Sequence, residues 1–128
     1  MNYVIDTHVL IWFITNDDKL PISIKNILED KSNNCYVSIA SLWEVSIKYS
    51  LGRLDLKADL KSIFQIIEES GFEVLPITIS QILKNVELDF FHRDPFDRML
   101  IVQAQQQKLI LITRDSELSQ YDVETLKA

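Results

Sequence analysis

The chain has 128 residues, of which 47% are hydrophobic and 25% charged, with only two glycines and three prolines. This composition is typical of a compact domain with one buried core, and we expect residues 1–128 to form a single domain. Thirteen basic and nineteen acidic residues leave a formal net charge of −6. Because proteins that bind nucleic acid by neutralising phosphates are usually basic, nucleic-acid chemistry here would need bound cations or a local basic patch.

The sequence contains no sign of a membrane or secretory segment. No apolar run approaches the roughly 20 residues needed to cross a bilayer, and the start MNYVIDTHVL lacks the features of a signal peptide. Cys35 is the only cysteine, so no internal disulfide can form, and its apolar neighbours indicate a buried thiol. We therefore expect a cytoplasmic protein with no membrane association.

Short apolar runs alternate with segments in which apolar residues recur at helical spacing. Ser38 or Ser41 can cap the third of the predicted helices, Gly52 ends it, and Pro95 suits the first turn of the last helix. In chain order, the pattern predicts strand 2–6, helices 8–16 and 22–30, strand 35–39, helices 42–52 and 57–70, strand 73–77, a short helix from Thr78 or Ser80 to about Val86, helix 95–107, strand 109–113 and a weaker strand 123–126.

The predicted fold class is α/β. Strands that are apolar on both faces and separated by helices are typical of a parallel sheet covered on both sides. We therefore expect a three-layer α/β/α domain with a mostly parallel sheet. In open parallel sheets the ligand site lies beyond the carboxyl ends of the strands, so residues at those ends are the first candidates for function.

Four acidic residues are expected at that edge. Asp6 ends the first strand, and Asp115 follows the fourth strand. Asp97 lies in the first turn of the helix before the fourth strand, and Glu44 lies in the first turns of the helix after the second strand. Each acid also has an ordinary structural explanation. Asp6 could belong to a turn, and Asp97 could interact with the helix dipole. Asp115 could cap a short helix, and Glu44 could pair with Lys48. Together they predict a cluster of carboxylates.

The negative charges of a carboxylate cluster must be neutralised. Like charges a few ångströms apart repel strongly in a partly dry cleft, so a shared proton or a bound divalent cation must relieve them. Oxygen-only ligands suit Mg²⁺ or Mn²⁺, and the absence of a Cys or His cluster argues against structural zinc. A magnesium-type site with open water positions is used for phosphoryl chemistry, which makes hydrolysis of a phosphate ester the favoured reaction.

Four segments in order resemble the motif blocks of the PIN-domain ribonucleases, specifically the VapC-like toxins of toxin–antitoxin pairs. They are IDTHVLIW, SIASLWEVSIKYSLGRL, HRDPFDRMLIVQA and LITRD, and the resemblance runs from about residue 3 to residue 125. It implies a Rossmann-like PIN domain and metal-dependent endoribonuclease activity. One departure is Val102 and Gln103, which stand in a helix that is often alanine-rich in the family.

The resemblance also implies roles for individual residues. Asp97 matches the third acid of the family, whereas Asp94 fits the cap of the same helix. Glu44 would act through water or orient the attacking water, and Thr7 and Thr113 would hydrogen-bond the carboxylates. The implied acidic quartet is Asp6, Glu44, Asp97 and Asp115, with Asp6, Asp97 and Asp115 as ligands of Mg²⁺ or Mn²⁺.

Contacts with the RNA substrate are less constrained by the sequence. Arg98 could contact a phosphate or hold the carboxylates in place, and His8 and His92 could serve in catalysis, in packing or in phosphate contacts. The candidates for RNA contact, against the alternative of ordinary solvated charges, are Arg53, Lys57, Arg93, Arg98 and Arg114.

The resemblance implies two protein partners, a cognate antitoxin and a second copy in a homodimer. Trp12, Phe13 and Trp43 suit either the core or an interface, and we expect another chain to cover part of the apolar run LIWFI. A non-toxin RNA-processing nuclease and a catalytically silent interaction module of the same fold are the alternatives. Phosphoaspartate enzymes and receiver domains fit poorly, because position 8 is His and the third strand ends in PIT.

Overall fold

The computed structural model describes residues 1–128 and contains five strands and six α-helices. The predicted order of strands and helices is confirmed. None of the helices has the length and apolar character that crossing a membrane requires. The elements are β1 (Asn2–Ile5), α1 (Thr7–Ile14), α2 (Ile22–Glu29), β2 (Asn34–Ser38), α3 (Ile39–Ser50), α4 (Leu60–Glu69), β3 (Glu73–Leu75), α5 (Ile79–Glu87), α6 (Pro95–Gln107), β4 (Ile110–Thr113), the 3₁₀ helix η1 (Ser116–Gln120) and β5 (Thr125–Lys127).

The five strands form one sheet in the order β3-β2-β1-β4-β5. Every pairing is parallel, and Tyr3 in the central strand lies opposite Cys35 of β2 and Ile110 of β4. The chain runs outward from β1 to β2 and β3, then returns to β4 on the other side of β1. The carboxyl ends of β1 and β4 therefore flank the point where the strand order reverses, which is the usual ligand position in such sheets.

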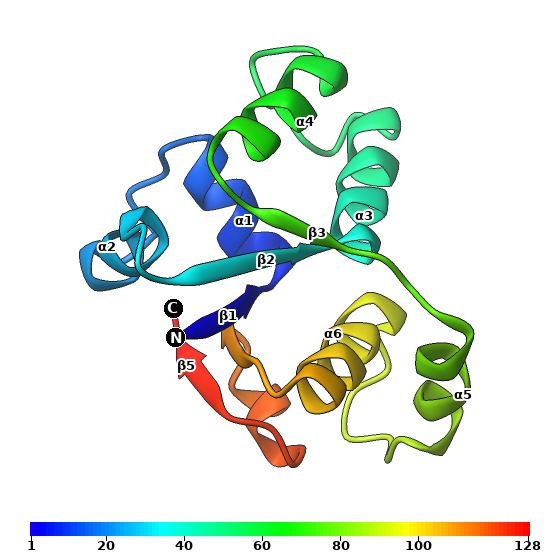
Figure 1. Ribbon diagram of the computed structural model, residues 1–128. Coiled ribbons are helices and arrows are strands. Elements are labelled where there is room, and N and C mark those ends of the chain that lie inside the picture. The colour runs from blue at the N-terminus through cyan, green and yellow to red at the C-terminus, as the bar shows by residue number, and fades with distance from the viewer.

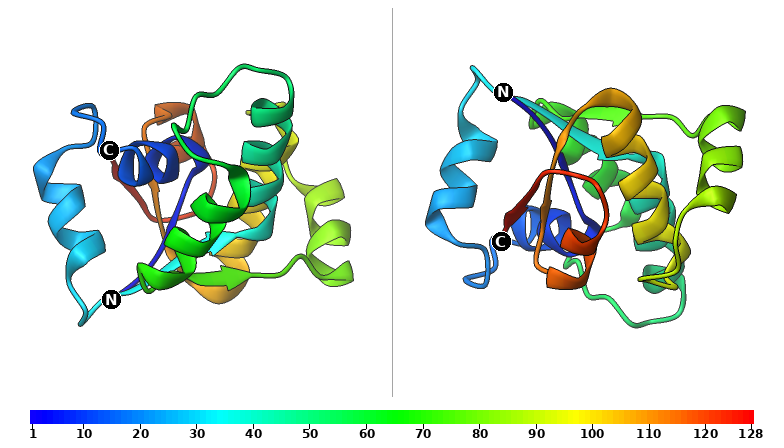
Figure 2. Two further views of the ribbon diagram at one scale, coloured as in Figure 1. Left: turned by 90° about the horizontal axis from the view of Figure 1, so that it is seen from above. Right: turned by 90° about the horizontal axis from the view of Figure 1, so that it is seen from below.

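Helices cover both faces of the sheet, which confirms the three-layer α/β/α fold (Figure 1). A hydrophobic core lies on each face of the sheet. Alternate side chains of β1 pack into one core or the other, because successive residues of a strand point to opposite faces. Tyr3 and Ile5 join a core with α1, α2 and α4, whereas Val4 joins a second core with α6 and η1. Helix α5 lies outside the sheet against α6, as the two views of Figure 2 also show.

Local sequence signals explain where the helices begin. Asp6 caps α1 by accepting a hydrogen bond from the main-chain N–H of Val9, and Ser38 rather than Ser41 caps α3. Thr78 forms a capping box with Gln81 at the start of α5. Asp94 caps α6, as predicted, and Pro95 occupies its first turn. These caps fix the orientation of the helices that carry two of the four acids.

Three sequence interpretations about apolar and amide side chains can now be compared with the structure. Trp12 is only 9% exposed, and the partly buried Ile11, Phe13 and Ile14 pack against the same core, so the domain itself covers most of the apolar run LIWFI. Trp43, by contrast, is 62% exposed although its ring packs edge-on against Phe96. Gln103 is fully buried, and its amide donates hydrogen bonds to Pro76 O and to Gln81 Oε1. Gln103, which stands in a helix that is often alanine-rich in the family, therefore joins α6 to the start of α5.

Candidate functional site

A polar cavity of about 310 Å³ opens at the carboxyl ends of β1 and β4. Three of the four predicted acids line it, and they come from three separate parts of the chain. None of its lining residues is hydrophobic. They are Asp6, His8, Asp97, Arg114, Asp115 and Ser116.

Asp6 is the most firmly held of these acids. Its side chain is buried, and Oδ1 accepts a hydrogen bond of 2.8 Å from the main-chain N–H of Val9. Oδ2 accepts hydrogen bonds from the Thr113 hydroxyl and from the main-chain N–H of Arg114. Burial nevertheless raises the pKa of Asp6 above its ordinary value, because these hydrogen bonds offset only part of the lost hydration.

Asp97, in the first turn of α6, receives no hydrogen bond on its carboxylate. Nε2 of His92 lies 3.6 Å from Oδ2, which is beyond hydrogen-bonding distance. Burial, followed by the negative charges of Asp94 and Asp6, raises the pKa of Asp97 to about 7. A carboxyl group in this position is relieved either by a proton or by a cation in the cavity.

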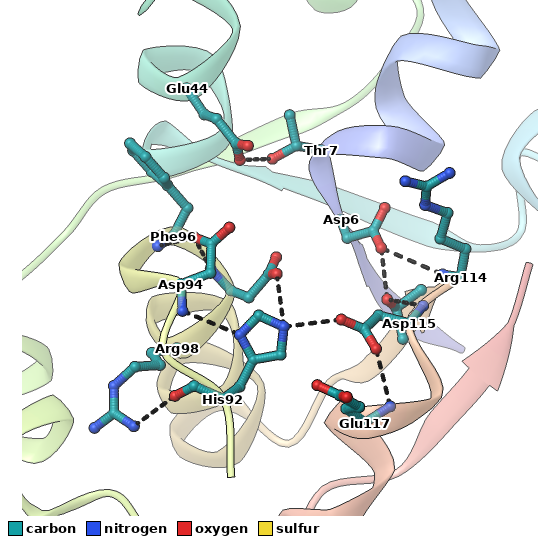
Figure 3. A network of polar contacts seen from close by, with 12 residues as sticks. Asp6, Thr7, Glu44, His92, Asp94, Phe96, Arg98, Arg114, Asp115 and Glu117 are labelled. Atoms are coloured by element: carbon teal, nitrogen blue, oxygen red, sulfur yellow. Dashed lines mark hydrogen bonds and ion pairs between the residues drawn. The ribbon is translucent and has the colours of Figure 1, made fainter. Parts of the chain in front are cut away.

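Asp115 follows β4 and caps η1. Its Oδ1 accepts a hydrogen bond of 2.9 Å from the main-chain N–H of Glu117, and its Oδ2 lies 2.8 Å from Nε2 of His92 (Figure 3). Its own main-chain N–H donates to the hydroxyl of Thr113, which in turn donates to Asp6. Thr113 therefore ties the first and last acids together, in agreement with the contact predicted for it.

Glu44 does not line the same cavity. Its carboxylate is buried on α3, where Oε1 accepts a hydrogen bond of 2.6 Å from the Thr7 hydroxyl and Oε2 pairs with Lys48 at 3.0 Å. Thr7 follows Asp6 in the sequence but hydrogen-bonds Glu44. The charge of Glu44 still contributes to raising the pKa of Asp97. The structure thus brings three acids to one cavity and places the fourth beside it.

Arg98 is the one RNA-contact candidate that the structure contradicts. Its side chain is buried and lies over the Phe90 ring, 4.2 Å from the ring centroid. The guanidinium is used entirely within the protein, so it neither reaches a substrate nor pairs with the acids. It donates to the main-chain carbonyl oxygens of Asn85, Leu88, Asp89 and His92.

The other three arginines are exposed. Arg114 lies at the cavity and its guanidinium is 5.6 Å from the centroid of the Trp12 ring. Arg53 and Arg93 line a neighbouring cavity together with Glu44 and Lys48. The basic side chains near the acids therefore form two groups, with Arg114 at one cavity and Arg53, Arg93 and Lys48 at the other.

His92 is the site residue whose role the sequence left open. The ring lies between acids that precede and follow β4, and the only local signal was its position two residues before the cap Asp94. Ligand atoms of His92, Asp115 and Glu117 all lie within 4.8 Å of one another. His8 also lines the cavity, where burial and then the charge of Arg114 lower its pKa.

Comparison with known proteins decides the family. The family model of the PIN domain matches residues 3–124, which include all four acids. The chain belongs to the PIN domain family. PIN domains are generally nucleases, and the acids of this PIN domain are residues that could hold a divalent metal. No curated protein sequence matches the chain.

Solved structures share the PIN-domain fold at low sequence identity. A chain of VapBC2 from Rickettsia felis, bound to a DNA fragment from its promoter, is 20% identical with a TM-score of 0.76, over 100% of this PIN domain and 99% of that chain. A chain of VapBC-1 from nontypeable Haemophilus influenzae is 18% identical with a TM-score of 0.69, over 99% and 98%. PAE2754 from Pyrobaculum aerophilum is 21% identical with a TM-score of 0.61, over 99% and 92%.

Proposed function

We propose that this protein is a divalent-cation-dependent endoribonuclease that acts in the cytoplasm as the toxin of a toxin–antitoxin pair. The observation that carries the proposal is the convergence of Asp6, Asp97 and Asp115 on one polar cavity at the point where the strand order reverses. Three carboxylates and no sulfur ligand form a donor set that suits Mg²⁺ or Mn²⁺. The uncompensated carboxylate of Asp97 is the group that gains most from such a cation.

The residues of the site have different roles. Asp6 is held by main-chain donors and by Thr113, so it presents a fixed carboxylate to the cavity. Glu44, hydrogen-bonded by Thr7 beside the cavity, would reach the cation through water or orient the attacking water. When bound, the cation would lower the pKa of that water and neutralise charge on the scissile phosphate. Ligand carboxylates of metal sites are commonly held by hydrogen bonds of this kind.

The basic side chains supply the contacts that an acidic protein needs for a polyanion. Arg114 lies at the cavity, and Arg53, Arg93 and Lys48 line the neighbouring one. An RNA strand that places a phosphate among the acids would meet Arg114 in this cavity and the other three in the neighbouring one. Local positive charge of this kind, together with the cation, compensates for the net charge of −6.

The proposed partners rest on the structural neighbours. Two of them come from VapBC assemblies, one of which was solved with promoter DNA. We propose by analogy that this chain binds a cognate antitoxin that blocks the cavity, and that it forms a homodimer. Expression of the wild-type chain alone should arrest bacterial growth, whereas co-expression of the antitoxin, or the substitution Asp97→Asn, should restore it.

The decisive experiment is cleavage of total RNA by purified protein in Mg²⁺ or Mn²⁺, with and without EDTA. Asp6→Asn and Asp97→Asn should each lower the cleavage rate at least about 100-fold, because loss even of an outer-shell partner typically lowers activity about 10–100-fold. Asp18→Asn is the matched control, since Asp18 is an exposed acid outside the cavity. Circular dichroism should show that all variants remain folded. Undiminished cleavage in EDTA or by the Asp6→Asn/Asp97→Asn double variant would refute the proposal.

A further inference from the structure

His92, in the segment between α5 and α6, lies between two of the cavity acids. Its Nε2 atom is 2.8 Å from Oδ2 of Asp115 and 3.6 Å from Oδ2 of Asp97. Figure 3 shows its ring pointing toward Asp115, with Asp94 on the opposite side of the ring. No other side chain makes an ion-pair contact with both of these acids.

The hydrogen bond on the far side of the ring decides which nitrogen carries the hydrogen. The main-chain N–H of Asp94 donates to Nδ1 over 3.1 Å, so Nδ1 is an acceptor and Nε2 carries the hydrogen. A nitrogen that carries a hydrogen donates to a carboxylate but has no lone pair for a metal. His92, Asp115 and Glu117 are therefore not a metal-binding trio, although their ligand atoms lie within 4.8 Å of one another.

The main chain of His92 is fixed on both sides. Its N–H donates over 2.9 Å to the Tyr121 hydroxyl, which itself donates to the carbonyl of Asp89. Its carbonyl accepts a hydrogen bond from the buried guanidinium of Arg98. Arg98 and Tyr121 thus hold the segment so that the ring cannot turn without breaking the hydrogen bond to Asp94. The donor is already in place before any ligand arrives, which limits the entropy lost on binding.

These contacts exclude two other roles. A general base needs a lone pair directed at the cavity, but the lone pair of the ring is used by Asp94. A metal ligand needs the same lone pair on Nε2. The remaining role is donation of a hydrogen bond from Nε2 to the carboxylate of Asp115. That carboxylate has only one further donor, the main-chain N–H of Glu117.

We propose that His92 is a positioning residue, whose Nε2–H fixes the carboxylate of Asp115 so that it and Asp97 face the same cation. The proposal rests on the proposed function, because it assumes that this cavity binds a divalent cation. Outer-shell partners of this kind typically change metal affinity about 10–100-fold. Because such a partner acts on the carboxylate that binds the cation, its effect on cation affinity can be measured without RNA.

Two substitutions separate the two nitrogens of the ring. In His92→Gln the side-chain amide nitrogen takes the place of Nε2 and can still donate to Asp115. In His92→Asn the amide oxygen takes the place of Nδ1 and can still accept from Asp94, but no donor reaches Asp115. We therefore expect His92→Gln to preserve cation binding within about threefold and His92→Asn to weaken it about 10-fold or more.

The first measurement is Mn²⁺ affinity by electron paramagnetic resonance of RNA-free protein, with the thermal stability of each variant recorded alongside. A His92→Asn variant that binds Mn²⁺ like the wild type, whatever its melting temperature, would overturn the positioning role. A wild type that binds no Mn²⁺ would instead refute the cation site of the proposed function. The two failures are thus distinguishable.

The second measurement is the ¹⁵N spectrum of the His92 ring by long-range ¹H–¹⁵N correlation, assigned by its absence in His92→Asn. We expect a hydrogen on Nε2 and an unprotonated Nδ1, both without and with saturating Mg²⁺. A ring with its hydrogen on Nδ1 and none on Nε2, or loss of the hydrogen from Nε2 on addition of Mg²⁺, would leave Nε2 without a hydrogen to donate to Asp115 and overturn the proposal.

Discussion

The three cavity acids differ in how their charge is compensated. Asp6 accepts hydrogen bonds from two main-chain N–H groups and a hydroxyl, and Asp115 accepts from Glu117 and His92. Asp97 accepts none, and its neighbours Asp94 and Asp6 are acids. The electrostatic repulsion of the site is therefore concentrated on one carboxyl group. This is the group whose protonation or ion binding should be most visible in the stability of the protein.

Asp97 should make the cation-free protein less stable as the pH rises. Its pKa in the folded protein is about 7, above the ordinary 3.8, so the folded state holds a proton that the unfolded state has released. The stabilisation is complete below the ordinary pKa and is lost as the pH rises through 7. We expect the free energy of unfolding, measured with urea in EDTA, to fall by on the order of 2 kcal/mol between about pH 5 and about pH 8.

The matched variant for this pH dependence is Asp97→Asn, which cannot titrate. It should show a shallower fall and should exceed the wild type in stability at about pH 8. Part of the fall should remain, because the pKa of Asp6 is also raised by burial. Equal pH dependence in the two proteins would show that Asp97 titrates near its ordinary pKa.

The site residues that sequence could predict are those defined by their place in an element. Asp6 and Asp115 follow strands and Asp97 lies in the first turn of a helix, so the parallel topology alone brings them to one edge. Arg98 and His92 were not resolved, because their roles come from contacts between elements. An arginine next to a catalytic acid suggests a phosphate contact, and only the carbonyls at the end of α5 and in the loop after it reveal that Arg98 is structural.

At the scale of elements, the start of α6 combines two opposing effects of one residue. The Asp94 carboxylate accepts hydrogen bonds from the main-chain N–H groups of Phe96 and Asp97, which stabilises the helix. The same negative charge raises the pKa of Asp97. Asp94 therefore helps to place Asp97 and also makes its ionised form less favourable.

Two substitutions at this position should separate the effects. Asp94→Asn keeps the cap without the charge, so stability in EDTA at neutral pH should be equal to or above that of the wild type. Asp94→Ala removes the cap and should lower the free energy of unfolding by about 1 kcal/mol relative to Asp94→Asn. Urea denaturation measures both. Equal stability of the two variants would mean that the cap contributes nothing.

The same pair of variants predicts a change in Asp97 itself. Both substitutions remove a neighbouring negative charge, so the pKa of Asp97 should fall from about 7 in each. A ¹³C titration of the Asp97 carboxyl group would measure the shift. An unchanged pKa would indicate that the charge of Asp94 contributes nothing and that burial and the other acids raise the pKa of Asp97.

The elements themselves were predicted more completely than their ends. All five strands and six helices were identified, but the third strand was predicted to continue to residue 77 and ends at Leu75, next to Pro76, which has no N–H to donate. The fourth helix begins after Asp59, whose carboxylate caps it by accepting from the N–H of Ser62. The strand order β3-β2-β1-β4-β5 was not predicted, because it depends on how the crossovers pack.

At the scale of the whole molecule, an acidic protein gathers three buried or half-buried carboxylates at the reversal point of its sheet. Folding without a cation must overcome this repulsion, whereas the unfolded chain keeps the same acids apart in water. Any cation that binds only the folded state therefore stabilises the entire domain. The proposed site can be tested through global stability, independently of any substrate.

Mg²⁺ should raise the melting temperature of the wild-type protein. At a free concentration 100 times the dissociation constant, binding to the folded state alone adds about 2.7 kcal/mol to the free energy of unfolding. The rise should be larger at about pH 8 than at about pH 5, because at the lower pH a proton on Asp97 competes with the cation. It should disappear in the Asp6→Asn/Asp97→Asn double variant and persist in Asp18→Asn. Calorimetry with NaCl at matched ionic strength provides the reference, since an equal rise in NaCl would show general screening of the acidic surface and no site for a divalent cation.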